Sequence, residues 1–498
     1  MVKIIDIINQ NPWWNKGKEF ASTDLHLRKA RPIFFSRREL DLRKGDIHIL
    51  RGCRQIGKTT YLKNLVKNLI ERGTSPRNIL YLSLDFFTSR REVRNALNYF
   101  LDATHDAEES YIFLDEITFL KDWNLELKYI ADSGIIGRCT IVATGSSAVG
   151  LREKGELLPG RGVEGNESYI KPLSFRQFVL HALEYLPAHM KSKEFQDSLE
   201  RLRLKLLKSQ IDLASDMEIT AQAIDSIIPF KKEIQYLFKI YVISGGIPAV
   251  INRYLQNRFG DEKEMIESTL SEIFVRDVLG DMARLQRQET VVRDILKGIL
   301  ERYGSRYSFS KLSTTVGRTH VTVIDSLEIL RDSFILQILY AYDFANKDMK
   351  LKGDKKIYFI DPFIYHSIKS YLSGEEVWDT INKTLIDENL QGMIGEGIVL
   401  SHLLMHMEIP YAREGSAFLW YHYDRSGKEI DAVMKAGDKY LGLEVKYRTN
   451  VDRRDVRRIS DIQEYILLSK DNIEFGKNVL IAPVDLFLSL LPVSGRNV

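Results

Sequence analysis

The chain has 498 residues, of which 44% are hydrophobic and 28% charged, and this composition excludes a disordered or fibrous protein. At about 100 to 200 residues per domain, the length predicts three or four structural units. Because the net charge is only +3, the charge by itself does not indicate a nucleic-acid partner, and any basic surface must be local.

The cysteine content and the apolar runs bear on the cellular compartment. Cys53 and Cys139 are the only cysteines, too few for a disulfide framework or a zinc cluster. The N-terminus lacks a basic flank followed by a sustained apolar run, and no segment approaches the roughly 18 apolar residues of a membrane span. We therefore expect a cytoplasmic protein without a membrane partner.

The first chemical motif is a Gly-rich loop between an apolar strand and an amphipathic helix, in GDIHILRGCRQIGKTTYLKNLVKNLI. Its spacing satisfies the phosphate-loop pattern, whose glycines let backbone amides face phosphate at a helix N-terminus. Lys58 is expected to neutralise the β and γ phosphates, and the Thr59 hydroxyl to ligate magnesium. The predicted nucleotide-binding residues are Gly52, Gln55, Gly57, Lys58, Thr59, Thr60 and Ser146.

Two more apolar strands follow, and the second ends in a pair of carboxylates. NILYLSLD ends at Asp85, which we expect to be a loop or capping residue. YIFLDEITFL ends at Asp115 and Glu116, at the edge where ligand sites of parallel sheets lie. Asp115 is expected to hold the magnesium ion, and Glu116 to orient or deprotonate the attacking water. An acidic pair after a strand is common by itself, so this prediction depends on the phosphate loop.

A fourth apolar strand, CTIVATG, ends in polar residues with two alternative roles. Thr144, Gly145 and Ser146 either sense the γ-phosphate from the neighbouring strand or cap the loop. The alternation of strands with helical segments predicts a parallel sheet between layers of helices, and hence a multidomain α/β protein.

Five motifs together resemble archaeal-type AAA+ ATPases that are fused to a restriction-endonuclease-like C-terminal domain. They are RGCRQIGKTT, LDEI, ATGSS, LLPGR followed by KPLSFRQF, and SGGIPAVINRYL. The resemblance covers nearly the whole chain and implies ATP and Mg²⁺ as cofactors. Cys53 stands where the family usually has Pro, a change expected on the outer turn of the loop and compatible with phosphate binding. Arg161 falls on the family's arginine before the KPLSF-like strand and is a candidate for contacting the γ-phosphate, within the chain or across a subunit contact. A solvent-exposed loop arginine is the equal alternative. The oligomeric state, a homo-oligomer included, stays open.

The middle of the chain reads as helices. Apolar residues at three- and four-residue spacing with charges between them are typical of helices with a solvated face. The resemblance implies a helical lid, broken at Gly245, Gly246 and Pro248, with an insertion at 184–232 to which the sequence assigns no role.

The segment RYSFSKLSTTVGRTHVTVIDSLEILRDSFILQILYAY predicts a short helix, a Gly-containing turn, a second helix and apolar strands, which resembles a winged helix-turn-helix. The residues that would contact DNA lie at the start of the second helix and in the loop NKDMKLKGDKK; they are Arg318, Thr319, His320, Thr322, Lys347, Lys350, Lys352, Lys355 and Lys356. Winged helices also bind proteins, so a protein partner is the equal alternative.

The last part of the chain contains EIDAVMKAGDKYLGLEVKYR, which predicts a hairpin turned at KAGDK, where Gly437 can take positive φ. Strand alternation places Glu444 and Lys446 on one face of their strand. Asp431, on the preceding strand, can face the same side across the hairpin. Glu396 lies near the start of the preceding helix, GMIGEGIVLSHLL.

This order of residues resembles a PD-(D/E)xK nuclease fold. The resemblance implies that Asp431 and Glu444 bind Mg²⁺, or Mn²⁺, and that Lys446 positions the attacking water, with Glu396 as the helix carboxylate. An E-x-K triplet arises easily by chance, and the same triplet at Glu126 lies in a helical segment. A salt pair between Lys446 and a neighbouring carboxylate, without cleavage, is the alternative.

The predicted organisation is an ATPase core with an N-terminal extension at 1–175, a helical lid at 176–290, a winged helix-turn-helix at 291–350, and a nuclease-like domain at 351–498. The function that this organisation favours is Mg²⁺-dependent ATP hydrolysis coupled to DNA binding or processing. The alternative is a nucleotide-dependent switch whose C-terminal domain binds protein or nucleic acid without cleaving it.

Overall fold

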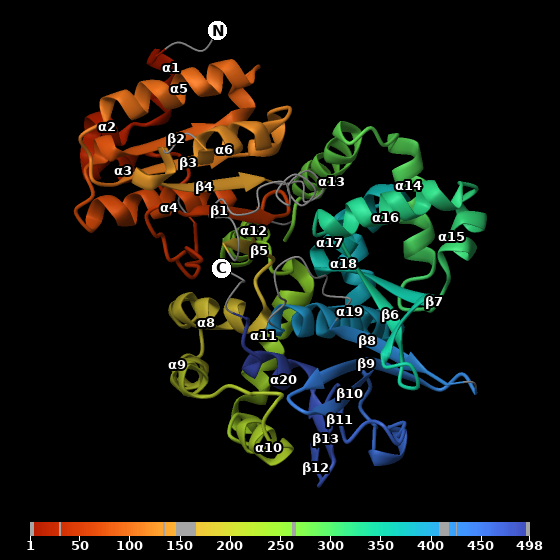
Figure 1. Cartoon of the computed structure of the whole chain (residues 1–498). Helices are drawn as coiled ribbons and strands as arrows, with labels where there is room; N and C mark the ends of the chain where they lie inside the picture. Colours follow the sequence, from red (N-terminus) through yellow and green to blue (C-terminus); the bar gives the residue numbers. More distant parts are fainter. Residues whose placement is uncertain are drawn as a thin grey trace.

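Two sheets organise the chain, a five-stranded sheet near the N-terminus and an eight-stranded sheet near the C-terminus, with helices between them (Figure 1). The computed structural model describes residues 4–28, 31–132, 135–145, 166–260, 265–407, 418–424 and 426–494. The chain is therefore a multidomain α/β protein with a parallel P-loop-like core and a separate C-terminal mixed sheet, as the sequence predicted.

The N-terminal sheet is parallel throughout, in the order β2-β3-β4-β1-β5. Its strands are β1 (Ile47–Gly52), β2 (Ile79–Ser83), β3 (Ser110–Asp115), β4 (Cys139–Gly145) and β5 (Glu167–Ile170). The inner strands are buried along their whole length because α4 (Lys58–Glu71), α5 (Arg90–Ala103) and α6 (Trp123–Asp132) accompany the sheet, as a continuous apolar run requires. Since β4 lies between β1 and β3, the carboxyl ends of these three strands meet at one edge.

The N-terminal extension docks on the edge strand β2. It comprises α1 (Ile4–Gln10), α2 (Trp13–Lys16) and α3 (Phe20–Thr23). The indole N–H groups of Trp13 and Trp14 both donate to the Ile79 carbonyl, at 2.9 and 2.8 Å. The Asn11 amide donates to the Tyr81 carbonyl and accepts from its N–H. These side chains satisfy backbone groups that an edge strand would leave to solvent.

The helical middle packs mainly on the C-terminal part of the chain. Its helices are α8 (Phe175–Tyr185), α9 (Lys193–Lys208), α10 (Met217–Asp225), α11 (Lys231–Ser244), α12 (Pro248–Phe259), α13 (Ser268–Arg284) and α14 (Glu289–Glu301). The break between α11 and α12 falls at the predicted glycines, and Gly246 approaches the Leu173 backbone so closely that a Cβ would lie 2.2 Å from its carbonyl oxygen. Within the insertion, the Ile211 N–H donates to the Leu490 carbonyl at 3.1 Å. The insertion therefore contacts the end of α20 (Val484–Leu490).

The next elements follow the predicted order of helix, turn, helix and strands. They are α15 (Phe309–Val316), α16 (His320–Asp332), β6 (Leu336–Asp343) and β7 (Asp348–Phe359), with Gly317 left-handed at φ 64° between the helices. β6 pairs with β7 on one side and meets β8 at Tyr421 on the other, so this hairpin belongs to the C-terminal sheet. The expected domain boundary at 350/351 falls inside β7.

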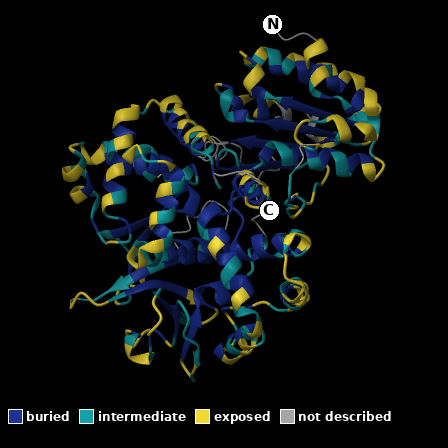
Figure 2. Cartoon of the chain, turned by 180° about the vertical axis from the view of Figure 1, so that it is seen from behind, coloured by how far each residue is buried: buried dark blue, intermediate teal, exposed yellow. Residues whose placement is uncertain are grey.

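The C-terminal sheet has the order β12-β13-β11-β10-β9-β8-β6-β7. Its remaining elements are α17 (Pro362–Ser373), α18 (Val377–Ile386), α19 (Glu388–His406), β8 (Leu419–Tyr423), β9 (Glu429–Ala436), β10 (Lys439–Lys446), β11 (Glu464–Ser469), β12 (Glu474–Phe475), β13 (Val479–Pro483) and α20 (Val484–Leu490). β9 and β10 form the predicted antiparallel hairpin, with Gly437 at φ 62°. The inner strands of both sheets are mostly buried, whereas the first half of β7 and the short strand β12 include exposed residues (Figure 2).

Within the described ranges, no single helix has the length and hydropathy to cross a membrane; Ile228–Ser244 with Pro248–Phe259 meets those criteria only as a pair bent by 116°.

Candidate nucleotide site and C-terminal carboxylate site

The phosphate loop joins β1 to α4 in the geometry that the motif requires. Gly57 and Gln55 both have positive φ, 96° and 58°. The Lys58 side chain is only 4% exposed, and its Nζ donates to the carbonyls of Gly52 and Cys53, at 3.0 Å each. This lysine folds back over the loop and is bonded to carbonyl oxygens that a phosphate can replace. The sequence predicted Cys53 on the outer turn of the loop, but Cys53 is only 1% exposed and is therefore a core residue.

The predicted magnesium residues lie in contact across neighbouring elements. The Thr59 hydroxyl donates to Asp115 Oδ2 at 2.6 Å, and the Tyr81 hydroxyl donates to the same oxygen at 2.8 Å. Thr144, at the end of the intervening strand, donates to Asp115 Oδ1 at 2.5 Å. A hydroxyl and a carboxylate at the start of α4 and the end of β3 are suitable ligands for Mg²⁺, directly or through water.

Glu116 is held in an unusual backbone conformation beside Lys58. Its φ is 53°, and its N–H donates to Thr144 Oγ1 at 3.1 Å. Oε1 lies 3.5 Å from Lys58 Nζ, while Oε2 is buried without a hydrogen-bond partner among the described residues. A buried carboxylate oxygen without a partner is costly, and an acceptor aimed at this edge of the sheet fits a bound water.

The remaining predicted residues of this site have mixed outcomes. Thr60 lies in the first turn of α4, half-buried. Asp85 accepts from the Ser83 hydroxyl at 2.6 Å, the loop contact that we expected. Gln55 reaches away from the loop to Asp277 on α13. Ser146 and Arg161 lie outside the described residues.

The C-terminal hairpin brings its predicted acidic residues together. Asp431 Oδ2 accepts from the Val445 N–H at 2.9 Å, which fixes this carboxylate against the backbone between Glu444 and Lys446. Although burial opposes ionisation of Asp431, Lys356 and Lys446 hold its pKa below the usual value.

Glu444 is the most isolated carboxylate of the hairpin. It is 1% exposed; Oε1 accepts from the Arg457 N–H at 2.6 Å, and Oε2 has no hydrogen-bond partner within the described ranges. Its ion-pair partner among the described residues is Lys446, whose Nζ lies 3.8 Å from Oε2. Burial raises the pKa of Glu444 to about 7. A divalent cation would supply the missing partner.

A buried lysine lies between three carboxylates of this site. Lys356, on β7, is 1% exposed and forms ion pairs with Glu396, with Glu429 at 2.6 Å and with Asp431 at 3.3 Å. Oxygens of these three carboxylates lie within 4.8 Å of one another, close enough to share a metal ion, but the Lys356 ammonium group already pairs with all three, and Arg306 pairs with Glu429 at 2.7 Å. Burial raises the pKa of Glu396 to about 7, and the Tyr358 hydroxyl donates to it at 2.5 Å.

Sequence reasoning missed Lys356 and Glu429 as members of this cluster and placed Lys356 in a phosphate-binding loop. The missed signals were alternation patterns: Glu429 is two residues before Asp431, and Lys356 is two before Tyr358, so each pair shares a face of its strand. The structure therefore corrects the prediction that Lys356 contacts DNA.

Several other predicted DNA contacts are also engaged within the protein. Lys355 is 4% exposed, and its Nζ donates to the carbonyls of Leu351 and Gly353, which excludes phosphate contact without rearrangement. Arg318 pairs with Asp294 on α14 at 2.5 Å. The contacts and exposure of the remaining predicted residues differ: Thr319 caps α16, Thr322 is half-buried, Lys350 lies 3.9 Å from Asp343, and His320, Lys347 and Lys352 are exposed.

Comparison with known proteins assigns the N-terminal part of the chain. Residues 44–179 match the AAA domain family. The chain carries a P-loop AAA-type domain. Residues 235–374 and 391–487 match two domains of unknown function, DUF8612 and DUF4143.

Two curated relatives align with most of the chain. An uncharacterized protein of Methanocaldococcus jannaschii is 23% identical over 90% of this chain and 85% of its own length. An uncharacterized protein of Haemophilus influenzae is 23% identical over 84% of this chain and 86% of its own length. Among solved structures, AMPPCP-bound DnaA from Aquifex aeolicus is 15% identical over 58% of this chain and 82% of that chain, with a TM-score of 0.21, too low to support an argument.

An arginine-rich loop leaves the C-terminal site directly after Lys446, and sequence reasoning did not single it out. It contains Arg448, Arg453, Arg454, Arg457 and Arg458, against two aspartates, Asp452 and Asp455. Its backbone is anchored because Val451 and Val456 are buried in a small apolar cluster. Arg457 and Arg458 are exposed, and neither has an ion-pair partner in the described part of the chain. This loop therefore forms a local basic surface.

Proposed function

We propose that the AAA-type domain hydrolyses ATP with Mg²⁺. The observation that carries this proposal is the convergence of Lys58, Asp115 and Glu116 on one edge of the parallel sheet, with Glu116 Oε2 buried and lacking a hydrogen-bond partner in the described ranges. A phosphate would replace the two carbonyl oxygens that accept from Lys58, and loop amides would bind the other phosphate oxygens.

The residues divide the reaction between binding and proton transfer. Thr59 and Asp115 would hold Mg²⁺, which neutralises charge on the β and γ phosphates. Glu116 orients the attacking water and accepts its proton as the water oxygen bonds to the γ-phosphorus and the bond to the β-phosphate oxygen breaks.

Two substitutions separate binding from hydrolysis. Lys58→Ala removes nucleotide binding, whereas Glu116→Gln preserves binding and lowers turnover by about 100-fold or more, the usual contribution of a general base. Lys67→Ala is the matched control, because Lys67 is exposed on the same helix and pairs only with Glu71 among the described residues, at 3.7 Å. Turnover by Glu116→Gln at the wild-type rate would contradict the assignment.

We further propose a second function, metal-dependent phosphodiester cleavage of DNA at Asp431, Glu444 and Lys446. The observation that favours it is Glu444 Oε2, a buried carboxylate oxygen without a partner in the described ranges that lies beside Lys446. Mg²⁺ or Mn²⁺ held by Asp431 and Glu444 would activate water, and Arg457 and Arg458, which are exposed after β10, would contact the phosphate backbone.

The cleavage test uses labelled single-stranded, double-stranded and branched DNA, with Mg²⁺ or Mn²⁺ and with or without ATP. Glu444→Ala is expected to lose cleavage while ATP turnover stays intact, and Glu474→Ala, exposed on β12, is the control. If no DNA is cleaved although ATP is hydrolysed, the C-terminal domain is a binding module and the chain is a nucleotide-dependent switch. Coupling of the two sites predicts that DNA changes ATP turnover.

A further inference from the structure

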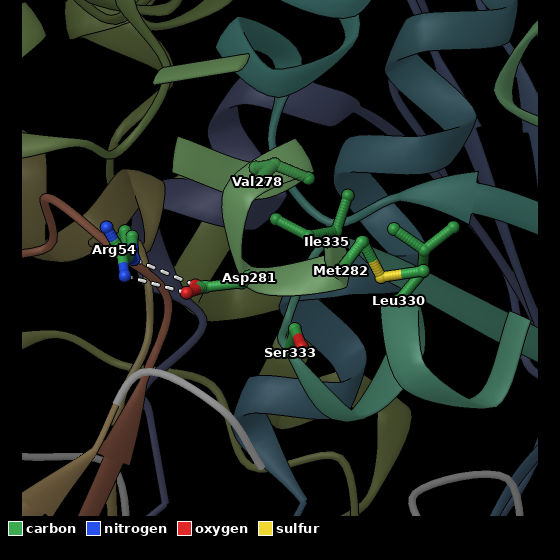
Figure 3. A pocket seen from close by; sticks show the side chains of 7 residues that line it. All are labelled: Arg54, Val278, Asp281, Met282, Leu330, Ser333 and Ile335. Atoms are coloured by element: carbon green, nitrogen blue, oxygen red, sulfur yellow. Dashed lines mark hydrogen bonds and ion pairs between the residues drawn. The ribbon is translucent and has the colours of Figure 1, made fainter. Parts of the chain in front are cut away.

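Helix α13 is bonded directly to the phosphate loop. Arg54 Nε donates to Asp281 at 2.8 Å (Figure 3). Its Nη1 donates to Asp277 at 3.2 Å. The next loop residue, Gln55, donates from Nε2 to Asp277 at 2.9 Å. Because Asp277 and Asp281 are four positions apart on a helix, they present both carboxylates on one face. Two consecutive residues of the nucleotide site are thus held by one face of α13.

A second contact joins the same helix to the other half of the nucleotide site. The Arg284 guanidinium, at the end of α13, lies 3.8 Å from the ring centre of Phe119. Phe119 ends the short helical turn η4 (Ile117–Phe119), which begins directly after Glu116. A pocket beside the contact is lined by Arg54 together with residues of α13 and of the turn after α16, which includes Ser333 (Figure 3). The helix therefore touches the elements on both sides of the phosphate-binding position.

The charges at this contact conflict with a bound triphosphate. The Arg54 and Asp281 side chains are 19% and 10% exposed, so their attraction is only partly screened by water. Burial raises the pKa of Asp281, and Arg54 opposes that rise. In this motif the loop amides face the α and β phosphates, and the lysine reaches the γ-phosphate. The Arg54 guanidinium lies 5.7 Å from the ring centre of Phe119, three residues after Glu116, whose carboxylate is 3.5 Å from Lys58 Nζ. Arg54 therefore lies on the side of the loop where the terminal phosphate is expected. A γ-phosphate would offer Arg54 a bidentate partner and would repel the two aspartates.

We propose that Arg54 operates a nucleotide-dependent latch: without a γ-phosphate it binds Asp277 and Asp281 of α13, and with ATP it turns to the γ-phosphate and releases the helix. The latch rests on the proposed ATPase function and adds its regulation.

The packing of α13 connects the latch to the C-terminal half of the chain. Phe274 on α13 lies edge-on to Phe363 on α17, with ring centres 6.1 Å apart. Arg287, just after α13, pairs with Asp325 on α16 at 3.2 Å. In Figure 1, α13 lies between the N-terminal sheet and these helices. Release of α13 from the phosphate loop would remove one of the contacts between the α16–α17 region and the ATPase core. Phe334, just after α16, keeps another, because its ring centre lies 5.8 Å from that of Tyr169 on β5.

Affinity for two nucleotides tests the competition. Asp277→Asn with Asp281→Asn removes the competing carboxylates and is expected to tighten binding of a non-hydrolysable ATP analogue by about five- to tenfold, with less than about twofold change for ADP. Arg54→Gln is expected to lower the preference for the ATP analogue over ADP. Glu272→Gln is the matched control, since Glu272 lies on the same helix and pairs with Arg276 at 3.2 Å. The single variant Asp277→Asn serves if the double variant does not fold.

Hydrogen exchange of α13 amides supplies a second readout. In the wild type, the ATP analogue is expected to speed exchange in residues 268–284 and ADP is not, whereas the double variant exchanges fast without nucleotide. The latch is wrong if the double variant binds both nucleotides with wild-type affinity and the ATP analogue does not change α13 exchange in the wild type. The ATPase proposal still stands in that case, provided that the wild type binds the analogue and Lys58→Ala does not. If the wild type binds no nucleotide, the ATPase proposal fails and the latch with it.

Discussion

Two buried lysines, Lys58 in the AAA-type domain and Lys356 in the C-terminal sheet, have opposite partners. Lys58 Nζ donates to two backbone carbonyls and lies 3.5 Å from one carboxylate. Lys356 Nζ forms ion pairs with three carboxylates. Both side chains are at most 4% exposed, so burial alone does not distinguish them.

The difference teaches how a buried charge relates to function. A lysine whose acceptors are neutral carbonyls keeps most of its charge available for an anion, which suits a nucleotide site. A lysine surrounded by carboxylates is already neutralised, and its removal leaves like charges buried together. We therefore interpret Lys58 as a ligand-binding residue and Lys356 as a residue that stabilises the C-terminal fold.

The largest expected effect is the loss of stability in Lys356→Met. The variant leaves Glu396, Glu429 and Asp431 without their shared cation, and we expect the free energy of unfolding to fall by about 3 kcal/mol or more. Thermal or denaturant unfolding measures the change. Because the three carboxylates lie close enough to hold a metal ion, millimolar Mn²⁺ is expected to restore part of the variant's stability.

Two controls make this prediction a test of the comparison. Lys352→Met changes an exposed lysine of the same strand and is expected to alter stability by less than about 0.5 kcal/mol. Lys58→Met is expected to lose nucleotide binding at a stability cost of about 1 kcal/mol, because two neutral carbonyls and a single carboxylate, Glu116 at 3.5 Å, lose their partner. Equal destabilisation by Lys58→Met and Lys356→Met would contradict the interpretation of Lys58 as a ligand-binding residue and of Lys356 as a stabilising residue.

The next effect concerns pH. The pKa of Glu444 is raised by burial from 4.5 to about 7, so the folded state holds this proton more tightly than the unfolded state. Its contribution to the free energy of unfolding is complete below pH 4.5 and is lost as the pH rises through 7, a decrease of about 2 to 3 kcal/mol. Glu444→Gln is expected to abolish this part of the pH dependence.

The measurement is the difference in unfolding free energy between wild type and variant from pH 5 to pH 8. Subtraction is needed because burial also raises the pKa of Asp361 and Asp485 to about 7. Glu474→Gln, an exposed carboxylate on β12, is the control. A metal bound at Glu444 predicts that Mg²⁺ or Mn²⁺ stabilises the wild type above pH 7 and leaves Glu444→Gln unaffected; parallel pH curves for the two proteins would contradict the raised pKa.

The smallest expected effect belongs to the arginine loop. Arg457→Ala with Arg458→Ala is expected to weaken DNA binding several-fold and to reduce the salt dependence of the binding constant by about one unit of slope per lost phosphate contact. Arg454→Ala in the same loop is the control, because Arg454 pairs with Asp452 at 2.6 Å. Titration of labelled DNA at several salt concentrations measures both quantities. If the salt dependence of the binding constant is unchanged in Arg457→Ala with Arg458→Ala, these two arginines do not contact the DNA phosphates.

Much of the local structure could be predicted from the sequence. The strand, loop and helix around Lys58, the strand that ends in Asp115, and the hairpin around Gly437 follow from short-range patterns of apolar residues and glycines, and the structure has each of them. The roles of these residues as nucleotide or metal ligands stay predictions. The proposed lid, winged helix and nuclease fold also stay predictions.

What failed was the assignment of charged side chains to solvent. Lys355 and Lys356 read as a basic loop, because a run of lysines beside glycine is typical of one. β7 instead extends through them into the sheet, where Lys356 meets carboxylates from α19 and β9.

By itself, the sequence determined which segments become strands and helices and which chemical groups stand at their ends, because backbone preference and side-chain alternation depend on neighbours in the chain. Tertiary structure alone decided the partners: Arg54 with Asp281 more than 200 positions away, Asp431 with Lys356, and Glu444 with the backbone of Arg457. The physical reason is that the availability of a charge for a ligand depends on burial and on nearby opposite charges, and both are set by segments distant in the chain.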